Sequence, residues 1–289
     1  MPERLSLMTF TIDVDIAMKK MTARECLQMA ADEGLQYVDV RSPSGHLLKA
    51  YSAAVKETGV KVLCYIAPVS FFSNGDETIR KLLTRHLETA AALGASLFMI
   101  VPVNVQKDER ICRKLGKAEI RQRLKKYFTL AISFARDKKL TICFETTPQD
   151  YTCLSGIEDC RWVLEAVPDL KLVYDTANML PHGDDPILYY EALKEHIVHT
   201  HLKDVRLTRE TWQDRLFRAE KSCDGQVMKC CLYGEGVIPL REILSRMESD
   251  GYEGTFALDF SHPEKYPANL IQNTAQFQQH LLFLKRVQK

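Results

Sequence analysis

Short runs of β-branched and aromatic residues alternate with longer stretches of helical periodicity from one end of this chain to the other. This alternation is typical of repeated βα units around a parallel sheet. The sequence contains eight such units, the number that closes a (β/α)₈ barrel. We therefore predict an α/β fold, a single-domain (β/α)₈ TIM barrel over residues 1–289. The predicted strands are Leu5–Phe10, Tyr37–Arg41, Lys61–Ala67, Leu97–Val103, Leu140–Thr146, Lys171–Asp175, Ile197–Lys203 and Thr255–Phe260.

Local signals mark several helix boundaries. Thr22 with Glu25 fits a capping box, and Pro186 suits a first helical turn. Glycines 34, 59, 94 and 251 each follow a helical stretch and precede the next strand or its approach. The main irregularity is the segment at about 205–236, which is too long for a simple βα connection. We expect this segment either to fold over the site as a lid or to form a surface insertion with a short helix.

Composition excludes several classes of partner. The 39 basic and 38 acidic residues nearly cancel, so we expect no binding to nucleic acid or to an anionic membrane surface. No signal segment precedes the first strand, and no apolar run approaches the roughly 18 residues of a membrane helix. The nine cysteines form no CxxC pair and predict reduced thiols. We expect an unexported, cytoplasmic protein with a small-molecule partner.

Four consecutive predicted strands each end in a residue that can bind a metal. Glu145, Asp175, His201 and Asp259 close strands five to eight. The C-terminal ends of barrel strands converge on one face, which is where barrel enzymes place their chemistry. We therefore expect these four side chains to gather there.

Clustered carboxylates in an apolar strand environment need a compensating charge. Burying one charged carboxylate costs on the order of several kcal/mol in lost hydration, and three carboxylates close together also repel one another. One divalent cation removes that repulsion, and three carboxylates with one imidazole suit manganese, our first choice, or magnesium, cobalt or zinc. His199 points to the same side of its strand as His201 but one layer deeper, so we expect it in the core.

At these residues the chain resembles the xylose-isomerase-like TIM-barrel superfamily, in particular its sugar phosphate isomerase/epimerase members. The resemblance spans essentially the whole chain. It rests on FET at 144–146, YDTAN at 174–178, HTHLKD at 199–204, GEG at 234–236 and YEGTFALD at 252–259.

The resemblance implies that Glu145, Asp175, His201 and Asp259 bind one metal ion. In related epimerases the last ligand is usually a glutamate, which pairs with the glutamate of strand five as an acid/base couple on opposite faces of the substrate. Asp259 is one methylene shorter, which places its proton-transfer role in question. The resemblance also implies a homodimer or homotetramer.

Four further residues are candidates for substrate binding. Asn178 stands where many epimerases have a histidine that holds substrate oxygens, and Arg206 stands where the resemblance suggests a side chain for hydroxyl groups or a phosphate. His182, in PHGDDP, and His262, just after Asp259, lie near the expected mouth of the barrel.

The function predicted is metal-dependent isomerisation or epimerisation of a ketose or keto-polyol, free or phosphorylated, through an enediolate. Glu145 is the first candidate for the base, and Asp259 would return the proton from the other face. A dehydratase of the inosose or dehydroshikimate type is the nearest alternative, because the same enediolate can expel a hydroxyl. A non-catalytic barrel that binds sugar and metal is a further alternative. A zinc AP-endonuclease is disfavoured, because the early strand ends VRSPSG, IAPVSF and VPVNVQ lack the extra histidines that branch needs.

Overall fold

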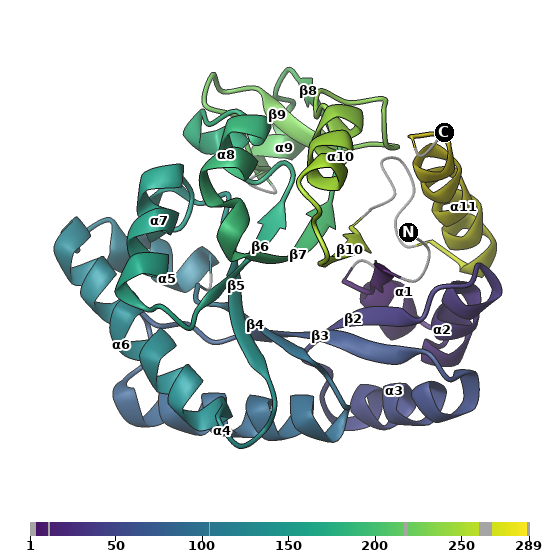
Figure 1. Cartoon of the computed structure of the whole chain (residues 1–289), viewed down its shortest axis with the longest axis horizontal. Coiled ribbons are helices and arrows are strands. Elements are labelled where there is room, and N and C mark those ends of the chain that lie inside the picture. The colour runs from purple at the N-terminus through teal and green to yellow at the C-terminus, as the bar shows by residue number, and fades with distance from the viewer. Residues whose placement is uncertain (1–3, 11, 104, 217–218, 260–267, 288–289) are drawn as a thin grey trace.

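A closed barrel of eight parallel strands forms the centre of the molecule, as Figure 1 shows. The computed structural model describes residues 4–10, 12–103, 105–216, 219–259 and 268–287. The order around the barrel follows the order along the chain, so the predicted (β/α)₈ fold is confirmed. The barrel strands are β1 (Leu5–Met8), β2 (Tyr37–Arg41), β3 (Lys61–Pro68), β4 (Leu97–Val101), β5 (Thr141–Glu145), β6 (Lys171–Asp175), β7 (Ile197–Leu202) and β10 (Thr255–Leu258).

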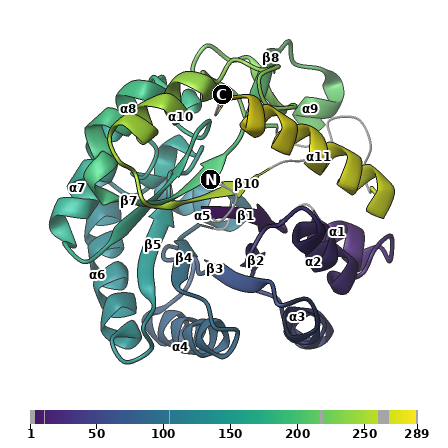
Figure 2. The same cartoon turned by 45° about the vertical axis from the view of Figure 1, so that its right-hand side comes forward.

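Helices surround this barrel as an outer ring, which the turned view of Figure 2 also shows. The longest, α6, packs beside α4 and against β5. The described helices are α1 (Ile12–Ala17), α2 (Ala23–Asp32), α3 (Gly45–Thr58), α4 (Asp76–Ala92), α5 (Val105–Cys112), α6 (Lys117–Ala135), α7 (Ile157–Ala166), α8 (Pro186–Leu193), α9 (Trp212–Leu216), α10 (Leu240–Ser249) and α11 (Leu270–Val287).

Alternation along each strand divides the core into two layers. In β3, Tyr65 and Ala67 join the large apolar cluster that includes buried residues of the helices. Cys64 and Ile66 belong instead to a smaller cluster made of strand residues alone. Successive side chains of a strand point to opposite faces, so the smaller cluster fills the barrel interior. A packed interior leaves the strand ends as the place for a cavity.

The predicted boundary signals are present. The hydroxyl of Thr22 accepts a bond from the Glu25 amide at 3.1 Å, and the Glu25 carboxylate accepts one from the Thr22 amide at 2.7 Å. Pro186 opens α8 behind the N-cap Asp185. Glycines 34, 59, 94 and 251 all have positive φ, the backbone region in which a side chain is strained.

The segment 205–236 has secondary structure of its own. Strands β8 (Val205–Thr208) and β9 (Val227–Cys230) form a two-stranded antiparallel sheet, with α9 between them in the chain. Within this segment Glu220 and Cys230 line the cavity described below. The segment is therefore an insertion with a short helix that also contributes to one wall of the cavity.

A buried carboxylate anchors this segment to β7. Asp204 accepts hydrogen bonds from the amides of Gly234 and Gly236 at 2.8 and 3.0 Å. A Cβ atom at position 236 would lie 2.1 Å from an Asp204 oxygen, so only glycine fits there. The GEG sequence is thus a turn wrapped around Asp204, and these two amides are not available to a ligand.

All nine cysteines are free thiols, and Cys223 is the exposed one. Among the described helices, none combines the length and apolar character required to cross a bilayer.

Candidate metal and substrate site

A cavity of about 540 Å³ opens at the C-terminal ends of the barrel strands. Glu145, Asp175 and Asp259 all line it, together with Asn178 and Lys203. Its size suits a small organic ligand, since pockets for such ligands usually measure about 300–1,000 Å³. The structure therefore brings three of the predicted metal-binding carboxylates to one cavity.

Strand register explains why these side chains meet. Asp175 of β6 is the direct register partner of His201 of β7. In β10, Ala257 pairs with His201, which places Asp259 two residues further on the same side of its chain and nearer the mouth. Glu145 pairs with Val173 and so ends β5 two residues below the level of Asp175.

Glu145, Asp175 and His201 form a compact group. One ligand atom from each lies within 4.8 Å of the others. His201 Nδ1 lies 2.6 Å from Glu145 Oε1. Asp175 Oδ1 accepts bonds from the amides of Ala177 and Asn178 at 2.7 and 2.8 Å, so the backbone turn after β6 holds this carboxylate in place.

The second oxygen of Asp175 has no hydrogen-bond partner although it is buried. The nearest cation is the Lys203 ammonium, whose nitrogen lies 3.9 Å from Asp175 Oδ2 and 3.9 Å from Asp259 Oδ2. Burial raises the pKa of Asp175 and of Asp259, and the charge of Lys203 opposes that rise in each. A buried carboxylate oxygen left without a partner is costly, which makes Asp175 Oδ2 the atom most in need of a ligand.

A nitrogen of His201 is the second buried polar atom of this group that lacks a hydrogen-bond partner among the described residues. Burial disfavours its charged form, but the charge and hydrogen bond of Glu145 outweigh burial and raise the pKa of His201 to about 9. Its Nε2 is buried without a hydrogen-bond partner and lies 3.7 Å from Asp39 Oδ2. An imidazole placed between two carboxylates in this way is held in one orientation.

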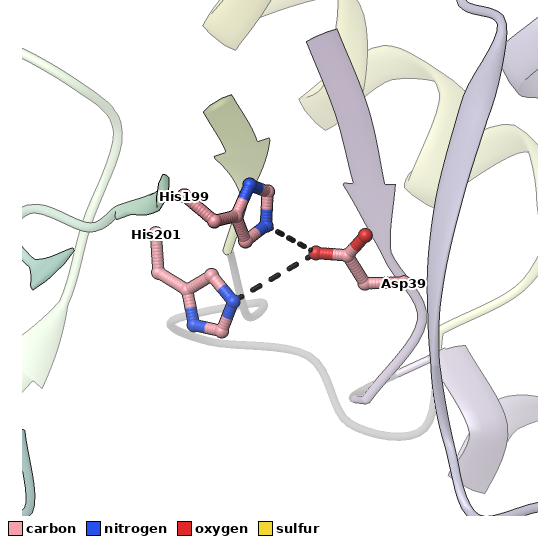
Figure 3. A group of neighbouring side chains, drawn as sticks. All are labelled: Asp39, His199 and His201. Atoms are coloured by element: carbon pink, nitrogen blue, oxygen red, sulfur yellow. Dashed lines mark hydrogen bonds and ion pairs between the residues drawn. The ribbon is translucent and has the colours of Figure 1, made fainter. Parts of the chain in front are cut away.

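Asp39 of β2 forms a second group with His199 and His201, drawn in Figure 3, where both rings face the carboxylate. His199 Nε2 lies 2.7 Å from Asp39 Oδ2, and Ser6 donates to Asp39 Oδ1 at 2.6 Å. The other nitrogen of His199 lies 2.6 Å from the Thr255 hydroxyl. Burial raises the pKa of Asp39, but the two imidazoles outweigh burial and lower it.

Both groups have donor atoms suited to a divalent cation, and the Glu145–Asp175–His201 group fits one better. In the Asp39 group every carboxylate oxygen and both nitrogens of His199 already have protein partners. In the Glu145 group Asp175 Oδ2 has none, and two of the three residues line the cavity. A cation bound by the Glu145 group would therefore supply a missing partner and would face a ligand in the cavity.

Asn178 and Lys203 link the two sides of the site. The Asn178 amide nitrogen donates to the Thr146 carbonyl at 3.0 Å, and Lys203 donates to the Asn178 side-chain oxygen at 3.2 Å. Burial lowers the pKa of Lys203, but Asp175 and Asp259 outweigh burial and raise it well above its usual range. Lys203 is thus a fixed positive charge in the cavity wall.

Two predicted substrate residues, His182 and Arg206, lie elsewhere. His182 is exposed on a short 3₁₀ turn and packs against Gly156, where a Cβ atom would meet its ring at 2.2 Å. Arg206 is exposed and pairs with Glu235. Neither is among the described residues that line the cavity. His262 falls outside the described residues.

Sequence reasoning missed four residues of this region: Asp39, Arg41, Lys107 and Glu220. Asp39 carried one signal, a single acidic residue inside the apolar run YVDV. Arg41 and Lys107 line the cavity from β2 and α5, and Glu220 does so from the 205–236 segment. Arg41 follows Asp39 by two residues in the same strand, whereas no spacing in the sequence marks Lys107 or Glu220.

Comparisons with known proteins agree with this architecture. The sequence profile of the family described as "Xylose isomerase-like TIM barrel" matches residues 27–287. Inosose dehydratase from Geobacillus thermodenitrificans (strain NG80-2) is 30% identical over 93 residues, which are 31% of this chain and 30% of that protein. The matched stretch thus spans less than a third of this relative.

Two solved structures superpose over nearly the whole chain. The IolI protein, described with a binding zinc atom, has a TM-score of 0.72 at 18% identity and covers 98% of this chain and 97% of its own. D-allulose 3-epimerase from Methylomonas sp. has a TM-score of 0.67 at 14% identity, and the superposition covers 99% of this chain and 98% of the epimerase. At these identities the similarity establishes the fold.

Proposed function

Because the chain belongs to the xylose isomerase-like TIM barrel family, we propose that it is a divalent-metal-dependent isomerase or epimerase of a sugar or sugar derivative. One observation carries the proposal: the buried, unpartnered Asp175 oxygen lies beside Glu145 and His201 at a cavity of about 540 Å³. A cation held there by Glu145, Asp175 and His201, with Asp259 as a fourth ligand, would polarise a ketone oxygen of the substrate. Manganese is our first choice, and the zinc named for the IolI structure keeps zinc among the alternatives.

Proton transfer at the carbon beside that ketone is assigned to two carboxylates. Glu145 is the base that removes the proton, because it lines the cavity and its position at the end of β5 is fixed by the His201 contact. Asp259 is the group that returns a proton in an epimerisation. It lines the cavity and approaches it from β10, three strands from β5. An isomerisation would need Glu145 alone.

The remaining residues bind and orient. Lys203 keeps a positive charge beside Asp175 and Asp259, and Asn178 fixes the direction of its ammonium. Asp39 accepts a hydrogen bond from His199, and its charge, 3.7 Å from His201 Nε2, favours the ring orientation in which His201 Nδ1 faces Glu145. An outer carboxylate of this kind orients a metal-binding histidine and keeps the ligand nitrogen unprotonated.

A dehydratase is the second candidate, favoured by the partial alignment with inosose dehydratase. Loss of water needs an acid above the leaving hydroxyl. Among the described residues that could supply this acid, Lys203 lines the cavity, whereas His182 does not.

The test is a panel of ketoses and cyclic keto-polyols incubated in D₂O with the full chain and manganese, magnesium, cobalt or zinc. An isomerase or epimerase introduces deuterium at the carbon next to the ketone, which proton NMR detects. A dehydratase releases water and forms an unsaturated ketone that absorbs in the ultraviolet. Glu145→Gln, which removes the base but keeps the side-chain volume, should abolish either signal.

Metal-dependent ligand binding with neither signal in the wild type would contradict the enzyme and leave the non-catalytic binding barrel. Equal turnover by wild type and Glu145→Gln would exclude Glu145 as the base.

A further inference from the structure

The cavity is electrostatically divided into two halves. The half built by β5, β6, β10 and the 205–236 segment carries all of its lining carboxylates, namely Glu145, Asp175, Asp259 and Glu220, with Lys203 among them. In the half built by β1 to β4 and the loops that follow them, none of the described lining residues is a carboxylate. It contains two cations instead, Arg41 and Lys107.

Arg41 lies across the barrel mouth from the metal-binding group. It ends β2, and β2 is four strands from β6 in either direction around the closed barrel. Arg41 also follows Asp39 by two residues, so it lies on the same inward side of β2, one layer nearer the mouth. A ligand that reaches both Asp175 and Arg41 must therefore cross the cavity.

The Phe10 ring covers one face of the Arg41 guanidinium and leaves its N–H groups free to bind a ligand. It lies over the Phe10 ring at 4.4 Å from the ring centre. Stacking of this kind leaves the N–H donors in the guanidinium plane available. Within the part of the chain that the structure describes, Arg41 makes no ion pair or side-chain hydrogen bond. Burial lowers the pKa of Arg41, and the charge of Asp13 offsets this only in part.

Neighbouring carboxylates leave the two cations without a close partner. Asp13 interacts with Arg41 through charge alone, and burial raises the pKa of Asp13 to about 6. Asp108, next to Lys107, is buried and accepts bonds from the Ser70 hydroxyl at 2.7 and 2.6 Å. Neither carboxylate is among the described lining residues of the cavity.

We propose that Arg41 and Lys107 form a subsite for an anionic group of the substrate, a carboxylate or a phosphate, at the end opposite to the keto-hydroxy group. A guanidinium edge matches the paired oxygens of both anions, and a lysine adds a second charge. This subsite rests on the proposed function for the orientation of the substrate. It replaces Arg206, which is paired with Glu235 outside the cavity lining, as the anion-binding arginine.

The first experiment measures simple anions on the metal-free full chain, so that no bound metal ion can hold them. Inorganic phosphate and acetate are titrated while the ¹⁵N signal of the Arg41 side chain is followed by NMR. We expect saturable shifts at Arg41 with one or both anions, and the better of the two identifies the phosphate or the carboxylate source. Loss of one charge-assisted contact should weaken binding of that anion at least about tenfold in Arg41→Gln.

Lys107→Gln should weaken the same binding by a smaller factor. The matched control is Arg24→Gln, because Arg24 is an exposed arginine on α2 that pairs with Glu57. Equal affinity in wild type and Arg41→Gln, or no shift with either anion, would overturn the subsite.

The second experiment compares matched ligands on the manganese-loaded protein by calorimetry: D-fructose, D-fructose 6-phosphate and the corresponding keto-uronic acid. The anionic members should bind at least about tenfold more tightly than the neutral sugar, and Arg41→Gln should remove the difference while its manganese affinity stays unchanged. If the protein binds manganese but binds the neutral sugar as tightly as the anionic ligands or more tightly, the subsite is overturned and the proposed function stands. Arg41-dependent anion binding in a chain that binds no metal would overturn the proposed function and keep the subsite.

Discussion

Two groups of side chains share His201 and differ in how completely their polar atoms are paired. The group with Asp39 and His199 is closed: each carboxylate oxygen of Asp39 and each nitrogen of His199 has a protein partner. The group with Glu145 and Asp175 is open: Asp175 Oδ2 is buried and has no hydrogen-bond partner. The closed group faces the barrel interior, whereas Glu145 and Asp175 line the cavity.

This difference in pairing indicates different roles for the chemically similar residues Asp39 and Asp175. Buried polar atoms that are already paired gain little from an added cation, whereas an unpaired carboxylate oxygen gains a partner. We therefore infer that Asp39 and His199 orient His201, and that Glu145, Asp175 and His201 would together bind the cation. Composition alone would have treated the two groups as equal candidates.

The largest expected effect follows from Asp175→Asn, which breaks the open group. The asparagine oxygen can still accept from the amides of Ala177 and Asn178, so the turn after β6 should survive. Structural zinc sites with four ligands bind with about 10–16 kcal/mol, so loss of one charged ligand should cost about 3–4 kcal/mol, several hundredfold or more in affinity. Calorimetric titration with manganese and zinc measures it.

Asp32→Asn is the matched control, since Asp32 is exposed on α2 and, within the described residues, accepts a local bond from Gln28 at 2.7 Å. Unchanged metal affinity in Asp175→Asn would exclude the open group as the site.

The pH dependence of metal-free stability should depend on the open group as well. The folded pKa of His201, about 9, lies above its ordinary value of 6.5. Its stabilising contribution is therefore fully present below pH 6.5 and is lost as the pH rises through about 9. A shift of this size corresponds to a stability loss on the order of 3 kcal/mol. Denaturant unfolding of the metal-free chain across this range measures the loss.

Glu145→Gln removes the charge that raises the pKa of His201, so its stability should change much less with pH between 6.5 and about 9. Parallel curves for wild type and Glu145→Gln would show that Glu145 is not the cause.

Asp39→Asn tests the closed group. The asparagine keeps the volume of the side chain and one carbonyl oxygen but loses the charge that faces His199 and His201. We expect metal affinity to fall by about 10- to 100-fold, the usual effect of an outer residue that orients a metal-binding histidine. Stability should fall by about 1–3 kcal/mol, because a buried hydrogen-bonded pair loses its charge. A loss of affinity as large as that of Asp175→Asn would identify Asp39 as a ligand instead.

Ser6→Ala should have the smallest effect. It removes only the 2.6 Å bond to Asp39 Oδ1 and leaves the contacts of Asp39 Oδ2 with the two histidines in place. Stability should fall by about 1 kcal/mol and metal affinity by no more than a few-fold. Thermal unfolding and the same metal titration measure both values. A loss as large as that of Asp39→Asn would mean that the closed group depends on Ser6 rather than on the charge of Asp39.

The sequence predicted the barrel because each strand and helix carries its own periodic pattern, and that pattern depends only on neighbours in the chain. It also predicted that Glu145, Asp175 and Asp259 meet, because parallel strands end on one face. The closeness of Asp39 to His199 and His201 required the barrel to close, since β2 and β7 are far apart in sequence. The sequence shows where a residue lies along its own strand, but it does not show which residue faces it across the barrel interior.

The side chains that line the cavity from outside strands β5 to β10 could not be predicted from the sequence, for a different reason. Arg206 and Arg41 are both arginines just after or at a strand end, yet Arg206 pairs with Glu235 and Arg41 lines the cavity. Arg206 lies in β8 of the inserted segment, and its pairing with Glu235 depends on how that segment folds, which no periodicity encodes. The same holds for Glu220, which reaches the cavity wall from within the 205–236 segment.

The most direct test of a metal held by Glu145, Asp175 and His201 is a crystal of the full chain soaked in manganese and measured at a wavelength where manganese scatters anomalously. The account predicts one strong peak within roughly 2.0–2.3 Å of ligand atoms of Asp175, Glu145 and His201, with Asp259 at its open side. A peak bounded by Asp39, His199 and His201, or a protein that binds no manganese, would contradict it.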